Sequence, residues 1–477
     1  MRLKKITLEN FRCYQHLEID LHANITVLVA NNGEGKTAIL DAIRIALWPF
    51  VSQFDLAKPA YADPANTIMI DDVSIVKSVQ QTSNTFGALD KMARQLPASI
   101  CATSNDSTWQ RYRDSETKRS QTKDDAGTKI LKTYAKGVQK AIRNLGEPAQ
   151  TLPVFGYYGT GRLWREKRLT DGKKGTTETT NQQIRTVAYR DCLDPASSFK
   201  QFEEWFTAAY FDVRDYQTNQ LLETGIMHIE VPEALIMPIK VVQEAVNQVL
   251  APVGWHSLQY GGEKYDKSLV LKHPKYGVMK ISQLSDGIKN MLAMIADIAY
   301  RCILLNTHLQ ENAAKTSPGV VLIDEVDMHL HPQWQQTVIA ALRQAFPEIQ
   351  FIVTTHSPQV LSTVPSESIR IIQHELNSDT EQIISTANLP LKQSRGVASA
   401  DVMAELQLVD PIPDVEEAHW LTQYKQLITQ GEHESDQGEA LKEKIIKHFG
   451  ESHQEWLECG RLIRLQVMKA KLPKRNQ

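Results

Sequence analysis

The chain has 477 residues, of which 42% are hydrophobic and 23% charged, and its net charge is −3. This composition excludes an extended disordered chain, predicts about two to four folded domains, and gives the whole molecule no electrostatic preference for nucleic acid. No run of 18 apolar residues occurs, so we expect a cytoplasmic protein without a membrane-spanning helix. The five cysteines lie far apart without a C-x-x-C pair, which argues against a disulfide framework and a zinc ribbon.

Residues 1–49 predict the first half of a nucleotide-binding head. Apolar runs predict strands over 3–8, 17–21 and 25–29, and an apolar-periodic helix begins at Lys36. Between the third strand and the helix lies ANNGEGKT, which has the glycines, lysine and threonine of a phosphate-binding loop. The order of strand, glycine loop and helix is the context in which such a loop works.

The residues of this loop have separate chemical tasks. Gly33 and Gly35 let backbone N–H groups turn toward a triphosphate, and Lys36 adds a positive charge at its β and γ phosphates. Thr37 offers a hydroxyl to Mg²⁺ at a helix N-terminus whose dipole favours anions. The predicted ATP-binding residues of the loop are Asn32, Gly33, Gly35, Lys36 and Thr37.

Residues 50–150 lack this clear periodicity and contain polar runs such as SNDSTWQRYRDSETKRSQTKDDAGTK. We interpret them as a lobe inserted into the head, mainly helical, with a mobile segment and a solvated charged face. No sustained heptad pattern crosses the insert, which argues against long coiled-coil arms.

Residues 151–370 predict the second half of the head. An apolar strand ends in the turn GTG at 159–161, and Arg162 directly after it stands within reach of a phosphate. A polar stretch at 169–183 predicts a flexible loop. Helices are predicted around 197–209 and 232–249, and strands near 268–272 and 278–281.

Three further motifs in this half complete a nucleotide site. Ser285 and Gly287 in QLSDG precede a long apolar-periodic helix; taken alone, such a serine is a helix cap. The strand GVVLI then ends in Asp324, placed to orient Mg²⁺ through water, and Glu325, placed to polarise the attacking water. His356, after the strand IQFIVTT, fits a sensor of the γ-phosphate.

In this order the motifs resemble those of the ATP-binding cassette ATPases, specifically the RecF, SMC and OLD branch. ANNGEGKT corresponds to Walker A, with Ala30 in place of the usual first glycine, LSDG to the signature, VVLIDE to Walker B and TTHS to the switch histidine. Val326 and Asp327 begin the D-loop, so the resemblance adds Asp327 to the nucleotide-binding residues. It also implies ATP and Mg²⁺ as cofactors and a homo-oligomer built through head-to-head ATP dimers, in which the signature serine of one subunit caps the γ-phosphate of another.

The longer segments FGYYGTGRLW, QLSDGIKNMLAMIADIA, DEVDMHLHPQWQ and VTTHSPQVLST resemble the PtuA ATPases of Septu and retron-linked antiphage defence. The resemblance covers about residues 1–50 and 150–370, plus a tail that contains SRGVASADVMAEL. It implies an α/β fold with an ABC-type P-loop ATPase head. It also implies an oligomeric regulatory or scaffold subunit that controls a partner HNH nuclease, with a reverse transcriptase and msDNA where a retron is attached. We expect ATP hydrolysis and no nuclease activity of the chain itself.

Residues 371–477 predict a helical tail without an apolar strand that ends in a metal carboxylate. Two alternatives stay open: a RecF/SMC-like repair ATPase that clamps duplex DNA itself, and an OLD-like nuclease. The lack of long arms disfavours the first, and the lack of a Toprim pattern disfavours the second. The basic end RLIRLQVMKAKLPKRNQ is a candidate DNA contact, although a solvated terminus is the simpler interpretation. We interpret His329 and His331 as interface or structural residues rather than zinc ligands.

Overall fold

The computed structural model describes residues 1–55, 64–78, 91–117, 121–144, 146–161, 184–195, 199–226, 229–376, 383–407 and 409–471. The predictions for Arg162 and for the loop at 169–183 lie outside these ranges. The chain divides into two compact units, 1–402 and 403–477, and each is described by itself.

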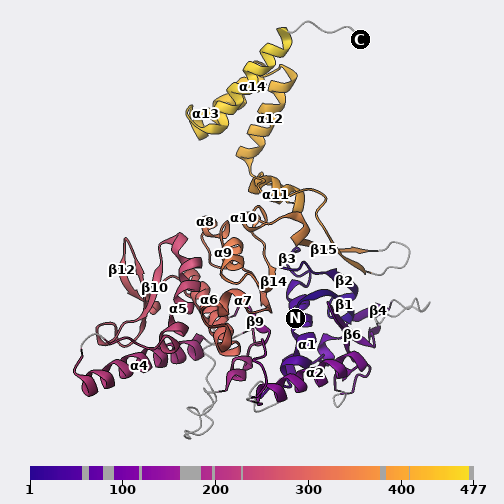
Figure 1. Cartoon of the computed structure of the whole chain (residues 1–477). Coiled ribbons are helices and arrows are strands. Elements are labelled where there is room, and N and C mark those ends of the chain that lie inside the picture. Colours follow the sequence, from indigo (N-terminus) through magenta and orange to yellow (C-terminus); the bar gives the residue numbers. More distant parts are fainter. Residues whose placement is uncertain are drawn as a thin grey trace. The chain divides into compact units, whose positions relative to one another are not determined.

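A six-stranded sheet forms the core of the first unit, in the order β16-β15-β3-β14-β13-β9 (Figure 1). Five of its strands run parallel, and β16 pairs antiparallel with β15 at one edge. Every residue of β3, β9, β13 and β14 is buried, which explains why these strands read as mainly apolar runs instead of alternating ones. Their bounds are β3 Ile25–Val29, β9 Val154–Tyr158, β13 Gly319–Ile323, β14 Ile349–Thr354, β15 Ile369–Leu376 and β16 Ile383–Asn388.

Helices pack on this sheet and on one another. Helix α1 packs on β14, α6 packs on β9, and α5 packs on both α6 and α9. The strand and helix predictions of the first 49 residues are confirmed, and so are those around 197–281. The helices of this unit are α1 Lys36–Val51, α2 Ala126–Ile142, α4 Phe199–Thr224, α5 Glu233–Leu250, α6 Asp286–Leu305, α7 Ala313–Thr316, α8 Pro332–Gln335, α9 Val338–Ala345 and α10 Pro358–Leu361.

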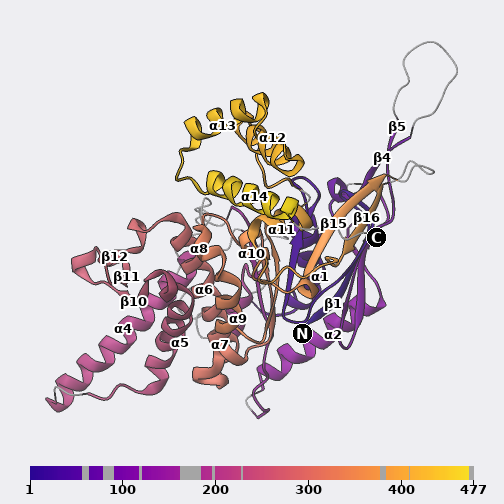
Figure 2. The ribbon, with the colours of Figure 1, turned by 90° about the horizontal axis from the view of Figure 1, so that it is seen from above.

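A second, antiparallel sheet joins the N-terminal strands to the inserted lobe, in the order β2-β1-β6-β7-β8. Helix α2 packs on β7 and lies beside α1 in both ribbon views (Figures 1 and 2). Two smaller sheets have the orders β10-β11-β12 and β4-β5. The bounds are β1 Leu3–Phe11, β2 Tyr14–Asp20, β4 Ile75–Ser78, β5 Lys91–Arg94, β6 Ala98–Ser104, β7 Thr108–Arg113, β8 Lys123–Asp124, β10 His256–Tyr260, β11 Leu269–His273 and β12 Gly277–Lys280.

The inserted lobe differs from the mainly helical lobe that the sequence predicts, because its described part contains the strands β4 to β8 and the helix α2. The polar run read as a solvated face includes β7, whose Trp109 and Arg111 are buried. The indole of Trp109 donates to the Ala46 carbonyl of α1 at 2.8 Å, and Arg111 donates to the Ile45 carbonyl at 2.9 Å. Carbonyl acceptors supplied by α1 satisfy these buried donors, which explains how a polar sequence forms interior structure.

Past residue 370 the chain first returns to the sheet and then becomes helical. Strands β15 and β16 belong to the core sheet, although the sequence predicts a helical tail from residue 371. Parallel pairing of Ile369 with Val27 and of Ile371 with Val29 connects segments more than 300 residues apart, which local periodicity does not reveal. From residue 399 the expected helices are present, with α11 Ser399–Leu406, α12 Glu416–Gln430, α13 Asp436–Phe449 and α14 Gln454–Lys471. The core formed by α12, α13 and α14 contains Tyr424, Leu427, Ile428, Leu441, Ile445 and Cys459.

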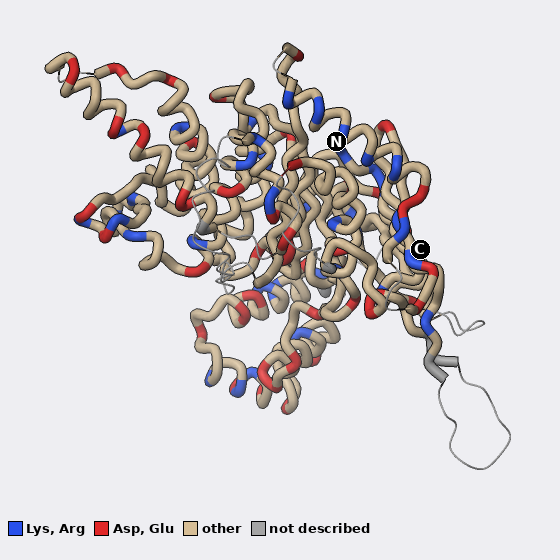
Figure 3. The backbone as a smooth tube through the Cα atoms, turned by 90° about the horizontal axis from the view of Figure 1, so that it is seen from below, with Lys and Arg blue, Asp and Glu red and all other residues tan. Residues whose placement is uncertain are grey.

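Two further properties of the described structure are the distribution of its charged residues and the apolarity of its helices. Lysine and arginine are interspersed with aspartate and glutamate over the described backbone (Figure 3). Within the described ranges, no helix is long and apolar enough to cross a membrane.

Candidate nucleotide site

The predicted site residues follow the carboxyl ends of three neighbouring strands of the core sheet. The loop 30–35 follows β3, Asp324 and Glu325 follow β13, and His356 follows β14. Parallel strands end at the same edge of the sheet, so these segments converge there. This edge is the usual ligand position in open α/β sheets.

Two glycines give the loop its shape. Gly33 and Gly35 both have φ of 85°, a left-handed conformation that favours glycine. A Cβ on Gly35 would also lie 2.4 Å from Cys13 Sγ and 2.6 Å from Tyr14 Oη. Ala30 is not among the positive-φ residues of the described chain, so its backbone does not require glycine.

Side chains from distant strands hold the loop in this shape. The Tyr14 hydroxyl donates to the Glu34 carbonyl at 2.8 Å, and His374 Nε2 lies 3.1 Å from the same oxygen. The two rings stack with centroids 5.4 Å apart. The Glu34 carboxylate accepts the backbone N–H of Asn31 at 2.7 Å. Sequence reasoning missed these supports, because Tyr14 and His374 lie outside the motif and only the fold brings them to it.

Lys36 points back over the loop. Its ammonium donates to the carbonyls of Ala30 at 2.8 Å and Asn31 at 3.1 Å. Burial lowers the pKa of Lys36, and the neighbouring carboxylates, Asp324 first among them, oppose that effect. The loop thus presents a buried cation beside its glycines, while Asn32 is exposed.

The predicted Mg²⁺ residues are in direct contact. Thr37 Oγ1 donates to one Asp324 oxygen at 2.9 Å, and Thr354 Oγ1 donates to the other at 2.7 Å. The Asp324 N–H donates to the Tyr158 carbonyl at 2.8 Å, and this bond fixes the backbone of the residue that carries the carboxylate. A hydroxyl and a carboxylate are hard oxygen donors of the kind that Mg²⁺ prefers, so this pair fits that ion.

Glu325 occupies a strained backbone position at the same edge. Its φ is 48°, which costs a non-glycine residue about 1–2 kcal/mol. Its N–H donates to Thr354 Oγ1 at 2.8 Å, so one threonine holds both acidic residues of the motif. Such strain is common at functional sites, where surrounding contacts maintain it.

His356 and Asp327 border the site. Burial and then the positive charge of Lys36 lower the pKa of His356, whereas Glu325, Asp327 and Asp324 act in the opposite direction. The imidazole is therefore neutral near pH 7. Asp327 accepts a hydrogen bond from Thr355 Oγ1.

The signature segment packs against the residues after Walker B. Ser285 is exposed and precedes α6 without a side-chain cap bond, and Gly287 is buried. A Cβ on Gly287 would lie 2.3 Å from the His329 carbonyl oxygen, so the helix approaches the D-loop closely. His331 Nδ1 accepts the Gln333 N–H at 3.3 Å and caps α8. Within the described ranges, no group of three His, Cys, Asp or Glu residues has the arrangement of a metal site.

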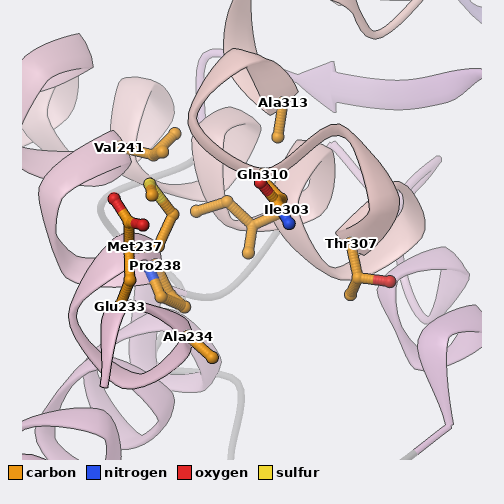
Figure 4. A pocket seen from close by; sticks show the side chains of 9 residues that line it. All are labelled: Glu233, Ala234, Met237, Pro238, Val241, Ile303, Thr307, Gln310 and Ala313. Carbon is orange, nitrogen blue, oxygen red and sulfur yellow. The ribbon is translucent and has the colours of Figure 1, made fainter.

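A pocket of about 270 Å³ lies elsewhere, between α5, the end of α6 and the segment 307–313 (Figure 4). Met237, Val241 and Ile303 provide apolar walls, with Glu233 and Gln310 also in the lining. None of the predicted nucleotide residues lines it. This pocket is therefore separate from the predicted nucleotide site at the sheet edge.

The positive φ and close contacts of Gly35 generate a prediction. Gly35→Ala should lower ATP affinity at least about tenfold, because the left-handed strain of about 1–2 kcal/mol adds to displacement of Cys13 and Tyr14. Titration with a fluorescent ATP analogue measures this change. Gly137→Ala is the matched control: it lies inside α2, nothing stands within 4 Å of its Cβ, and it should leave affinity unchanged. Equal ATP affinities of the Gly35 variant and the wild type would show that the loop does not require glycine at this position.

Two protein families match parts of this chain. Residues 5–223 match the family described as AAA domain, and residues 204–362 match the family described as AAA domain, putative AbiEii toxin, Type IV TA system. The Retron Vc95 probable ATPase of Vibrio cholerae is 26% identical, over 94% of this chain and 88% of the relative. The Septu protein PtuA of Bacillus mycoides is 30% identical over 35% of this chain and 23% of its own length.

Among solved structures, the SMC head domain from Thermotoga maritima aligns with 82% of this chain and 99% of its own, at 14% identity and a TM-score of 0.38. The two AAA matches together span the P-loop, signature, Walker B and switch segments. Residues 5–362 are thus similar to AAA-domain ATPases, and the chain is similar to a retron ATPase over nearly its whole length and to a Septu PtuA protein over about a third of it.

Proposed function

We propose that this chain binds and hydrolyses ATP with Mg²⁺ at the edge of its core sheet, as the regulatory ATPase subunit of an antiphage defence effector. The observation that supports the nucleotide site most directly is the 2.9 Å hydrogen bond between Thr37 and Asp324. It joins the P-loop helix to the Walker B strand across 287 residues of sequence. The relatives named as retron ATPase and Septu PtuA support the defence role.

In the proposed reaction each site residue acts on one part of the nucleotide. Lys36 and the loop N–H groups bind the β and γ phosphates, and Thr37 and Asp324 hold Mg²⁺ directly or through water. When bound, Mg²⁺ neutralises phosphate charge. Glu325 accepts a proton from the attacking water, and the neutral His356 donates a hydrogen bond to the γ-phosphate.

Two copies of the chain would complete the site. Ser285 is exposed at the N-terminus of the 20-residue helix α6, where the helix dipole favours an anion. The segment that follows Asp327 approaches this helix, because a Cβ on Gly287 would lie 2.3 Å from the His329 carbonyl oxygen. We infer that Ser285 caps the γ-phosphate held by a second copy, so ATP closes a head-to-head homodimer and hydrolysis opens it.

We assign DNA cutting to a partner HNH nuclease, with reverse transcriptase and msDNA where a retron is attached, because the chain resembles the PtuA ATPases of Septu and retron-linked defence. In unit 403–477, Leu457, Leu465 and Met468 of α14 are exposed large apolar residues. This surface of the helical unit is the proposed docking site for the nuclease.

The role of Glu325 leads to a first test of chemistry. Glu325→Gln should bind ATP and Mg²⁺ normally but hydrolyse ATP about 10²–10⁴-fold more slowly, because the amide cannot accept the proton. Phosphate release and ATP affinity are measured in parallel, with Lys36→Ala as the contrasting variant that loses affinity itself. Hydrolysis near the wild-type rate in the Glu325 variant would refute its role as general base.

The composite site is tested by subunit mixing. A Ser285→Arg chain and a Lys36→Ala chain should each be inactive, whereas their heterodimer contains one intact site and regains part of the ATPase activity. Native mass spectrometry verifies that heterodimers form. If verified heterodimers remain inactive, the site closes within one chain.

The division of labour is tested by co-expression with the product of the neighbouring gene. The chain alone should not cut DNA, and the complex should, with cutting altered by Lys36→Ala. A chain truncated after residue 402 should lose the partner in a pull-down, since docking is assigned to unit 403–477. Cutting by the ATPase alone would favour an OLD-like nuclease, and a complex that survives truncation would move docking to the inserted lobe.

A further inference from the structure

A buried polar triad connects helix α6 to strand β9. The Tyr158 hydroxyl donates to Asp297 Oδ2 at 2.8 Å, and Arg301 Nε donates to the same oxygen at 2.8 Å. Tyr158 and Asp297 are each 3% exposed and Arg301 is 2% exposed. Tyr158 and Asp297 lie in the longer segments FGYYGTGRLW and QLSDGIKNMLAMIADIA, but no member of the triad was assigned a role in the nucleotide site.

Each end of the triad is anchored to a different structural element. The Tyr158 carbonyl accepts the Asp324 N–H at 2.8 Å, and Tyr158 pairs with Ile323 in the sheet register. The Arg301 guanidinium donates to the carbonyls of Ala188 and Arg190. Tyr158 thus contacts the Walker B backbone with its main chain and the signature helix with its side chain.

Near its beginning, the signature helix also approaches the segment that follows Walker B directly. Gly287 packs against the carbonyl oxygen of His329. Gly287 and Asp297 are separated by ten residues, or about 15 Å along the helix axis. Two contacts this far apart fix both the position and the tilt of α6 against the segment that contains Asp324.

The chemistry of the triad makes this connection sensitive to geometry. Burial and the adjacent Asp297 raise the pKa of Tyr158 well above its usual value, so the hydroxyl keeps its proton and donates. Burial is the largest single influence on Arg301 and disfavours its charge, but Asp297, Tyr158 and Cys192 together outweigh burial and raise the pKa of Arg301. A buried ion pair contributes little net stability compared with apolar packing, and its directional bonds tolerate little displacement.

We propose that Tyr158 and Asp297 are positioning residues that couple the signature helix to the Walker B carboxylates. In this proposal, which rests on the proposed function, contact of Ser285 with the nucleotide of a second copy sets the orientation of α6. The hydroxyl of Tyr158 transmits that orientation to strand β9 and, through its carbonyl, to Asp324 and Glu325. Hydrolysis is thereby linked to dimer closure, while ATP binding at the P-loop does not depend on the triad.

The test removes one hydroxyl from the complete chain. Tyr158→Phe should lower kcat for ATP hydrolysis about tenfold and leave the Kd for ATP within twofold of wild type. Tyr189→Phe is the control, because Tyr189 is 1% exposed and its hydroxyl donates to the Pro153 carbonyl at 2.8 Å, just before the same strand β9. Both variants should lower Tm similarly, but the control should keep its kcat. An equal loss of kcat in both variants would overturn the proposal by showing a general packing effect.

A double-mutant cycle with Ser285→Ala distinguishes coupling from packing. If Tyr158 only packed in the core, its effect on kcat would not depend on Ser285. If Tyr158 acts through the signature helix, the kcat loss of Tyr158→Phe should largely disappear in the Ser285→Ala background. Additive losses would overturn the coupling while leaving the ATPase function intact. Absence of hydrolysis in the wild-type chain would instead refute the proposed function, and this inference with it.

Discussion

The hydrogen bond between Thr37 and Asp324 is the contact on which the proposed site depends. It forms only because β3 and β13 lie on either side of β14, so the residues that follow all three strands meet at one edge. Thr354 at the end of β14 extends the contact to the other Asp324 oxygen and to the Glu325 N–H. The hydroxyls of Thr37 and Thr354 therefore position the whole acidic motif.

The remaining elements support this edge from different directions. Tyr14 and His374 hold the Glu34 carbonyl of the loop, and they come from the N-terminal sheet and from β15. The inserted lobe is bonded to the other side of α1 through Trp109 and Arg111. The P-loop helix is consequently held between the core sheet and the lobe, so the geometry of the nucleotide site depends on structure formed far from it in sequence.

This arrangement suggests how a nucleotide signal would leave the site. The proposed Mg²⁺ ligand Asp324 shares its backbone contact with Tyr158, and Tyr158 bonds the signature helix. Helix α6, whose N-terminus would meet a second copy, is thus connected to Asp324 by hydrogen bonds that Tyr158 makes with its side chain and its main chain. An ATPase of this design is suited to switching an assembly between two states, which is the role proposed for it in a defence effector.

The sequence by itself predicted the nucleotide-binding motifs and determined the four fully buried strands β3, β9, β13 and β14, because a P-loop and buried parallel strands depend on local residue order. Lys36, Thr37, Asp324 and Glu325 were identifiable from their motifs, and the structure brings them together. Only the tertiary structure decided the strands of the inserted lobe, the return of β15 and β16 to the core sheet, and the supports from Tyr14, His374 and Tyr158. Those features depend on pairing between segments tens to hundreds of residues apart, and a pattern read along the chain does not contain that information.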